Sequence, residues 1–163
     1  KDQTPSLTTI QTIFAKIEAI LNSRPLLALS NSPADLDVLT PAHFLIHRPL
    51  IAPPSEPDDS PASLLPKWKL VRNIEKSFWK RWQKEYLLTL QSKEKWNTPT
   101  RPPKEGEIVI IKEDNTPPLS WKLGRIVRLT YGADGTSRVA ELRTTSGPLT
   151  RPLAKLCPLP DSP

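Results

Sequence analysis

The sequence predicts an α+β fold, with helices in the first part of the chain and a small β-barrel at its end. Two segments, residues 8–23 and 67–90, repeat apolar side chains at helical spacing. From Gly106 onward, short segments rich in Val and Ile alternate with turn signals. The 20 prolines against 5 glycines also favour short elements, because proline lacks a backbone donor.

The first predicted helix covers residues 8–23. Thr8 is an acceptable N-cap, and Pro25 is expected to end the helix. Its apolar face has no expected partner except the run 43–50, so we interpret residues 1–50 as the last part of a larger domain that lies upstream. The chain contains no Met, which also indicates a piece of something longer. The apolar positions are Ile10, Ile13, Phe14, Ile17, Ile20 and Leu21.

Residues 51–66 form the next predicted segment, a linker rich in proline and acidic residues. A connector follows over residues 67–98, with a helix from about Lys67 to Leu90. On a helical wheel its apolar side chains share about a third of the circumference, and its cations lie almost opposite. The apolar set is Trp68, Val71, Phe78, Trp79, Trp82 and Tyr86, and the cationic row is Lys69, Arg72, Lys76, Lys80 and Lys84.

The wheel bears on the stretch SFWKRWQKEY at residues 77–86, where rings and cations alternate. Such a mixture is typical of single-strand binders, which stack rings on bases. The separation of the two sets instead favours rings that pack against neighbouring elements. Five like charges in one row repel each other unless an anion is near, but such a row is also typical of a plain solvated face.

Four strand-like segments lie in residues 104–158, and the pair Asp134–Gly135 predicts a tight hairpin turn. So short a meander buries a core best when it bends strongly, which predicts an SH3-like β-barrel. Residues 159–163 are expected to be a tail.

Charge is distributed unevenly along the chain. Residues 1–66 carry four Lys/Arg and seven Asp/Glu, a net charge of −3, whereas residues 67–163 carry nineteen and ten, a net charge of +9. The basic part suggests a polyanionic partner, although excess positive charge also serves solubility alone. The single cysteine cannot form an internal disulfide, so we expect an intracellular protein. No apolar run is long enough to span a bilayer, so we expect no membrane-spanning segment.

Residue patterns for metal or covalent chemistry are weak. His43 and His47 stand four apart, but no further ligands accompany them, so we expect no metal and no cofactor. Cys157 is interpreted as a small buried apolar group. Asp35 and Asp37 are assigned to a loop, without a third carboxylate on a rigid element.

Several phrases resemble one known family. They are LNSRPL at 21–26, LTPAHFLIHRPL at 39–50, FWKRWQKEYLLTLQ at 78–91, VIIKEDNTPPLSWKLGRIV at 109–127 and RPLAKLCPLP at 151–160. Together they resemble the C-terminal part of a Pao/BEL-type retrotransposon polyprotein, namely the end of the integrase catalytic core plus a C-terminal domain of unknown function. In that family a glycine usually stands where this chain has His47.

The resemblance implies that residues 1–50 end the catalytic core and that all three metal-binding carboxylates precede Lys1. It therefore implies no catalysis by this chain. It also implies that the barrel and connector helix bind DNA through the phosphate backbone, with low sequence specificity. The implied DNA-binding residues are Lys69, Arg72, Lys76, Lys80, Lys84, Arg125, Arg128, Arg143, Arg151 and Lys155.

Other partners implied by the resemblance are the integrase core and further integrase subunits, with no membrane and no small-molecule substrate. The expected location is the nucleus or a cytoplasmic particle. An alternative is a protein-interaction module that bridges subunits or tethers chromatin, for which Trp121 and Tyr131 are the expected exposed barrel aromatics. A third alternative is a decayed or truncated reading frame.

Overall fold

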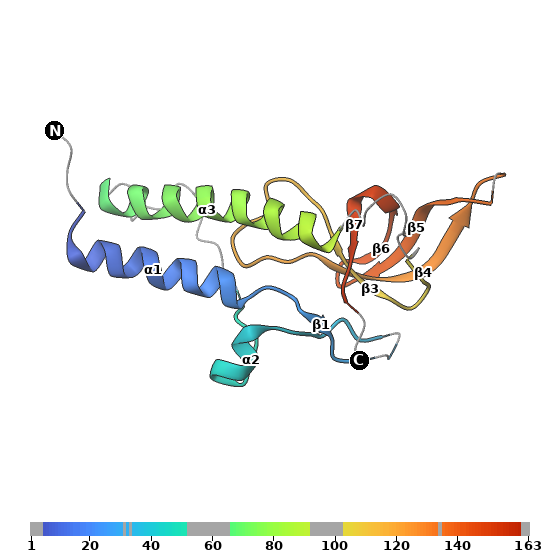
Figure 1. Ribbon diagram of the computed structural model, residues 1–163, viewed down its shortest axis with the longest axis horizontal. Helices are drawn as coiled ribbons and strands as arrows, with labels where there is room; N and C mark the ends of the chain where they lie inside the picture. The colour runs from blue at the N-terminus through green and yellow to red at the C-terminus, as the bar shows by residue number, and fades with distance from the viewer. Residues whose placement is uncertain are drawn as a thin grey trace.

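Two long parallel helices lead into an antiparallel sheet in the computed structural model of the chain (Figure 1). The helices are α1 (Leu7–Asn22) and α3 (Pro66–Leu90). They run in the same direction, since Lys16 pairs with Glu75 and, further along both segments, Pro25 accepts a hydrogen bond from Tyr86. The structure describes residues 5–30, 32, 34–51, 66–91, 103–133 and 135–160.

Helix α1 confirms the first predicted helix with a shift at its start. Ser6, not Thr8, is the N-cap, because the Ser6 hydroxyl accepts the Thr9 amide at 3.3 Å. The apolar face finds a partner within the chain, since α1 packs along α3 and buries Ile20 there. Phe14 on the same predicted face is 65% exposed, so α3 covers only part of it.

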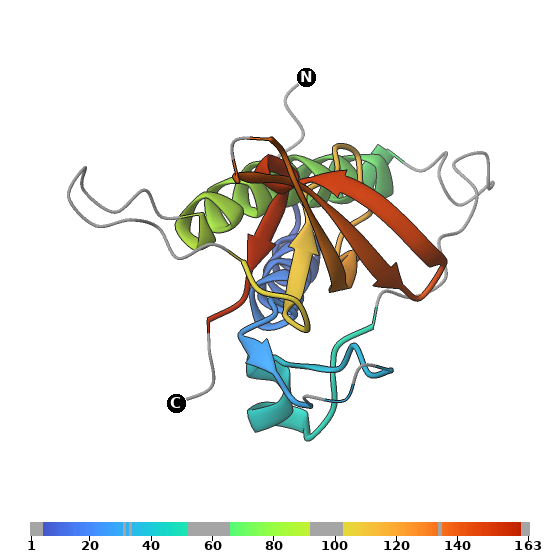
Figure 2. The ribbon, with the colours of Figure 1, turned by 90° about the vertical axis from the view of Figure 1, so that its right-hand side faces the viewer.

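A short hairpin and a one-turn-and-a-half helix connect α1 toward α3. Strand β1 (Leu27–Ala28) pairs with β2 (Val38–Leu39), and α2 (Pro41–Ile46) follows directly. Thr40 precedes α2, and its backbone amide donates to Nδ1 of His43 at 3.0 Å. These elements lie beside the sheet rather than apart from it (Figure 2).

Five strands form the sheet, in the order β6-β5-β4-β3-β7 with every neighbouring pair antiparallel. A 3₁₀ helix, η2 (Leu153–Lys155), joins β6 to β7. Figure 2 shows how strongly the strands twist against one another. The strands are β3 (Ile108–Ile111), β4 (Leu123–Tyr131), β5 (Ser137–Thr144), β6 (Gly147–Pro152) and β7 (Leu156–Pro158).

The α+β class is confirmed, but the sheet does not close into a barrel. Strands β6 and β7 remain its two edges within the described part of the chain. Pro148, Pro152 and Pro158 lie on these edges, and proline has no amide hydrogen to contribute to a closing ladder. Leu149 and Leu153 pack against the core cluster instead.

The strand β3 is buried on both faces, which explains its unbroken IVII sequence. One face contributes Val109 and Ile111 to the inner core of the curved sheet. The other face packs Ile110 and Cys157 against Leu87 of α3. The sheet therefore lies between its own inner core and the C-terminal half of α3.

Several sequence predictions fall on residues outside the described ranges. They are the linker residues 52–65, the end of the connector at 92–98, Asp134 of the hairpin and the tail residues 161–163. At that hairpin, Gly135 has the positive φ of 71° that the turn prediction requires. None of the helices in the described part has the length and apolar character to cross a membrane.

Candidate nucleic-acid interface

Four aromatic rings form one cluster where α3 meets the sheet. The ring of Trp121, just before β4, packs edge-on against Trp79 with centroids 4.9 Å apart and against Trp82 at 5.8 Å. Trp82 and Tyr86 stack at 5.3 Å with nearly parallel planes. Tyr86 also packs edge-on against Trp121 at 5.7 Å. The rings of the SFWKRWQKEY stretch are therefore a packing surface, as the helical wheel predicted.

The polar atoms of this cluster are bonded within the chain. The indole of Trp79 donates to the Thr116 carbonyl at 2.8 Å, and the indole of Trp121 donates to the Ser23 hydroxyl at 3.1 Å. The Tyr86 hydroxyl donates to the Pro25 carbonyl. Burial raises the pKa of Tyr86 above its usual value, and the nearby Arg24 charge opposes this. The phenol therefore stays a neutral donor at physiological pH.

The buried face of α3 differs from the predicted stripe. Trp68 belongs to the predicted stripe but is 48% exposed, because the first turns of α3 extend past the sheet. Gln83, absent from that stripe, is buried and bonds the Thr116 hydroxyl at 3.1 Å. The sequence did not predict this hydrogen bond, because a polar residue on a helix rich in cations is expected to be exposed to solvent.

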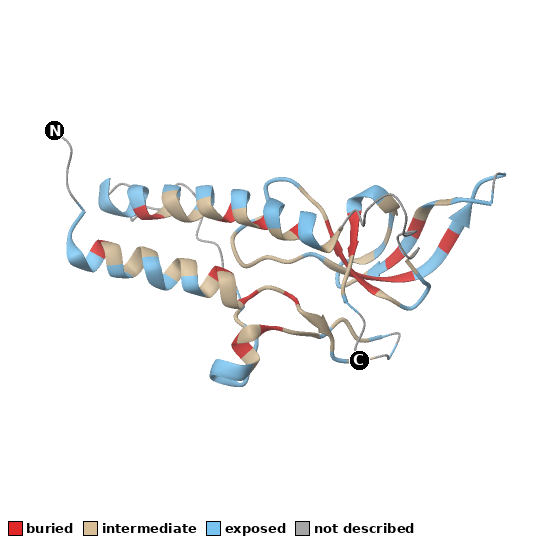
Figure 3. Ribbon diagram, in the orientation of Figure 1, coloured by how far each residue is buried: buried red, intermediate tan, exposed pale blue. Residues whose placement is uncertain are grey.

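The cationic row of α3 is mostly exposed, and exposed residues alternate with half-buried and buried ones along this helix (Figure 3). Lys69, Lys76, Lys80 and Lys84 are exposed, whereas Arg72 is half-buried. At 1.5 Å per residue, the row extends over about 22 Å. Within the described ranges, Lys80 and Lys84 take part in no ion pair, while Arg81 beside them pairs with Glu85 at 2.9 Å.

The predicted sheet cations are divided among several places. Arg128 is exposed on β4, directly across the ladder from Glu141, and Arg143 is exposed on β5. Arg151 is half-buried and lies 3.6 Å from Glu113, which also bonds Lys122. These cations hold the pKa of Glu113 below its usual value, with the Lys122 hydrogen bond as the largest cause. Part of the Arg151 charge is thereby compensated.

The prediction that Arg125 contacts phosphate is wrong. Arg125 is only 4% exposed, and its guanidinium donates to the backbone carbonyls of Gly106, Ser30 and Asp35. From the sequence, a charged side chain on a strand is expected to be exposed. Instead, Arg125 is covered by the loop of the β1–β2 hairpin. Its donors are occupied and it offers nothing to a ligand.

Lys155, in η2, lies next to residues that contact the C-terminal end of α3. The Gln91 amide, at the end of α3, donates to the carbonyls of Ala154 and Leu156 at 3.1 and 3.3 Å. Lys155 lies between these two residues and is exposed. Lys155 therefore lies near the C-terminal end of α3, about two helical turns beyond Lys84, whereas Lys69 lies at the opposite end of the helix.

The two histidines do not share a helical face. His47 follows the last turn of α2 with a left-handed φ of 58°, a conformation that favours glycine. A glycine would adopt this φ freely, whereas the His47 side chain makes it sterically costly. Among the described residues, no three His, Cys, Asp or Glu side chains gather closely enough to hold a metal ion.

Cys157 confirms its interpretation as a small apolar group. It is fully buried between Ile110 and Leu87. Burial raises the pKa of its thiol to about 11, with a smaller opposing effect of Lys112. The thiol is therefore protonated at physiological pH and is a poor nucleophile.

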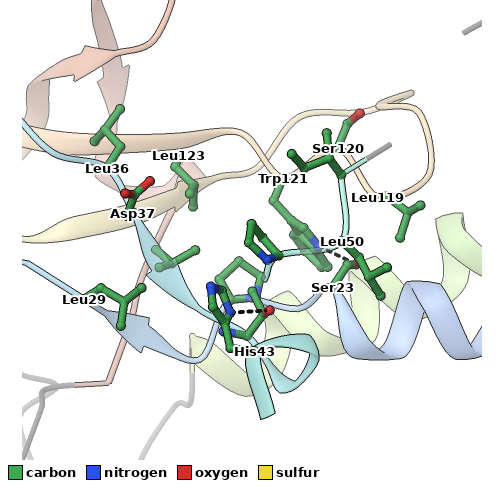
Figure 4. Close-up of a pocket in the computed structure, with 15 residues that line it drawn as sticks. Ser23, Leu29, Leu36, Asp37, His43, Leu50, Leu119, Ser120, Trp121 and Leu123 are labelled. Atoms are coloured by element: carbon green, nitrogen blue, oxygen red, sulfur yellow. Dashed lines mark hydrogen bonds between the residues drawn. The ribbon is translucent and has the colours of Figure 1, made fainter. Parts of the chain in front are cut away.

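A cavity of about 580 Å³ opens between the β1–β2 hairpin, α2 and the loop before β4 (Figure 4). Its lining is mostly apolar, with Leu36, Leu50 and Trp121 on different sides. The polar side chains of Asp37 and His43 also border it. The sequence did not predict this cavity, because its walls come from segments about 70 residues or more apart in the chain.

The comparisons with known proteins concern the second part of the chain. The family of unknown function DUF5641 matches residues 66–159, which contain α3 and all five strands of the sheet. No curated protein and no solved structure matches the chain. The match covers more than half of the 163 residues. The chain belongs to the family of unknown function DUF5641.

Proposed function

We propose that this chain is the C-terminal part of a Pao/BEL-type retrotransposon integrase and binds DNA through phosphate contacts, with low sequence preference. In this proposal the chain positions DNA and does not cut or join it, because the resemblance assigns the metal-binding carboxylates to positions before Lys1. Its partners are DNA and the integrase core, and it acts in the nucleus or in a cytoplasmic particle.

The observation that carries the proposal is the exposed row on α3. In the second half of this helix the rings of Trp79, Trp82 and Tyr86 pack against Trp121. The exposed side of that half therefore carries Lys80 and Lys84 without interleaved rings. Lys80 and Lys84 stand four residues apart, where like charges repel and destabilise the helix. A bound polyanion removes this repulsion, and Lys155 adds a further exposed cation near the C-terminal end of α3.

The absence of stacked rings from this row favours a duplex over a single strand. Single-strand binders combine a basic groove with exposed rings, whereas the rings here are packed against Trp121. Lysine contacts to phosphate carry no sequence information, because the backbone is the same at every base pair. We therefore expect affinity that falls steeply with salt and varies little with sequence.

The test measures duplex DNA affinity as a function of salt for the wild-type chain and for the double variant Lys80→Gln/Lys84→Gln. Each phosphate contact contributes about 0.9 to the slope of log affinity against log salt, so the double variant should lose about 1.8. Arg81→Gln is the matched control, because Arg81 is exposed on the same helix but pairs with Glu85. Its slope should change less.

Two outcomes would contradict the proposal. One is binding that salt does not affect, or no binding below about 100 μM at low salt, where non-specific DNA binding normally ends. The other is an Arg81 variant that lowers the slope as much as the double lysine variant, since that would remove any special role of the row.

The cavity favours a second candidate function, a protein-interaction module that bridges integrase subunits. Trp121 borders this cavity, and Tyr131 at the end of β4 is 62% exposed. Because Trp121 also packs against the rings of α3, its substitution would disturb the fold. Tyr131→Ala and Leu36→Asp are therefore the better variants for this test. Loss of self-association in sedimentation, with unchanged DNA affinity, would favour this candidate over DNA binding alone.

A further inference from the structure

Arg125 is a buried cation whose partners come from two distant parts of the chain. Nη1 donates to the Gly106 carbonyl at 2.6 Å, in the turn before β3. Nη2 donates to the carbonyls of Ser30 at 2.8 Å and Asp35 at 2.7 Å, in the loop between β1 and β2. Nε also donates to Asp35, at 3.2 Å. All three nitrogens are therefore bonded, and two of them bond the β1–β2 loop.

This arrangement makes the loop necessary for the sheet and not merely adjacent to it. A buried guanidinium is costly unless its donors are satisfied. Without residues 30–35, Arg125 would keep only the Gly106 carbonyl among the acceptors described above. The Asp35 carboxylate accepts the Asp37 amide, so it shapes the loop that presents these carbonyls.

Further contacts join the same two parts between Arg125 and the middle of α1. The Tyr86 hydroxyl donates to the Pro25 carbonyl, and the Trp121 indole donates to the Ser23 hydroxyl at 3.1 Å. Lys16 of α1 bonds Glu75 of α3 at 2.7 Å, with the Glu75 side chain only 15% exposed. Polar contacts therefore follow the whole length of the junction.

We propose that the family-matched region, residues 66–159, contains a binding site for residues 23–37 of the same chain, anchored by Arg125. The site recognises an extended loop through its backbone carbonyls and the adjoining Ser23 hydroxyl. The two parts bind each other even when no peptide bond joins them. The described residues of the two parts thus form one unit, and this inference does not rest on DNA binding.

The test separates the two parts after folding. A protease recognition sequence is inserted within residues 52–65 of the full chain, and the folded protein is cleaved and passed over a gel-filtration column at about 10 μM. We expect the two fragments of the otherwise wild-type chain to elute together. Fragments that elute separately would overturn the proposal.

Variants identify the anchor. Arg125→Ala should weaken the association of the fragments by at least about thirtyfold, because it removes a buried charged donor and leaves three part-buried carbonyls without it. Arg143→Ala is the matched control, since Arg143 faces Arg125 across the β4–β5 ladder but is exposed. It should leave the association unchanged. Equal effects of the two variants would remove Arg125 from the proposed site.

A milder substitution keeps the test decisive where Arg125→Ala prevents folding. Tyr86→Phe retains the ring stack and removes only the hydrogen bond to Pro25. We expect the fragments to associate about three- to tenfold more weakly, with an unchanged circular dichroism spectrum. An unchanged affinity in this variant would contradict a junction held by these polar contacts.

Discussion

The two halves of α3 have different surroundings, although they belong to one continuous helix. The first half contacts α1 along a narrow face, where Val71 is buried and Glu75 reaches Lys16. The second half packs one face against the sheet and the loop before β4, and this face buries Trp79 and Leu87. The buried face therefore turns around the helix axis from one half to the other.

Because the buried face rotates around the axis of α3, a single helical wheel does not predict correctly which residues are buried. A wheel assumes one partner along the whole helix, whereas α3 has α1 on one side and the sheet on another. Leu87 lies on the wheel among the cations and is nevertheless buried against Cys157 and Ile110. Trp68 lies among the rings and is nevertheless exposed. The position of an apolar residue along the helix decides its burial as much as its angle.

The largest expected effect comes from removing one tryptophan in each half. Trp79 is 2% exposed, so Trp79→Ala should lower the free energy of unfolding by about 3–5 kcal/mol. Trp68→Ala should lower it by less than about 1 kcal/mol, because half of that side chain already meets solvent. Chemical denaturation followed by circular dichroism measures both. Equal losses would show that the first half is packed as tightly as the second.

Cys157 reports whether the second half opens. The thiol pKa of about 11, against an ordinary value of 9.0, makes the thiolate about a hundredfold scarcer at pH 8 than in the unfolded chain. Alkylation in the native state should therefore be at least about a hundredfold slower than after unfolding. Rapid native labelling would mean that α3 separates readily from β7.

The same shift predicts a pH dependence. The folded state holds the thiol proton more tightly than the unfolded state, so it binds more protons between pH 9 and about 11. The contribution to stability is complete below pH 9 and decreases as the pH rises through this interval. Cys157→Ser or Cys157→Ala should reduce this alkaline loss, measured by denaturation at several pH values.

The smallest expected effect concerns ion pairs in the two halves. Glu75→Gln weakens the contact between Lys16 and α3, and we expect a loss of about 1 kcal/mol in stability because Glu75 is mostly covered. Glu85→Gln is the matched control in the second half, where the pair with Arg81 is fully exposed. It should cost less, and a larger loss for Glu85 than for Glu75 would reverse the comparison.

The local elements were largely predictable because they depend on neighbours in the sequence. Apolar spacing located α1 to within a residue and α3 from about Lys67 to Leu90, one residue short at its start. The four strand-like segments located β3 to β6, whereas β7 (Leu156–Pro158) lay outside them. Closure of the barrel was not predictable from local patterns. It requires the two edge strands, β6 and β7, to pair with each other, and prolines on these strands reduce the hydrogen bonds available for pairing.

The sequence by itself determined the α+β class, the inward rings of α3 and the neutral character of Cys157. Only the tertiary structure decided that Arg125 is buried, that α1 has its partner in α3, and that Lys155 lies near the C-terminal end of α3. The physical reason is that burial depends on segments brought together from far apart. Arg125 is read as a surface cation until the carbonyls of Ser30 and Asp35, about 90 residues earlier, are placed against it.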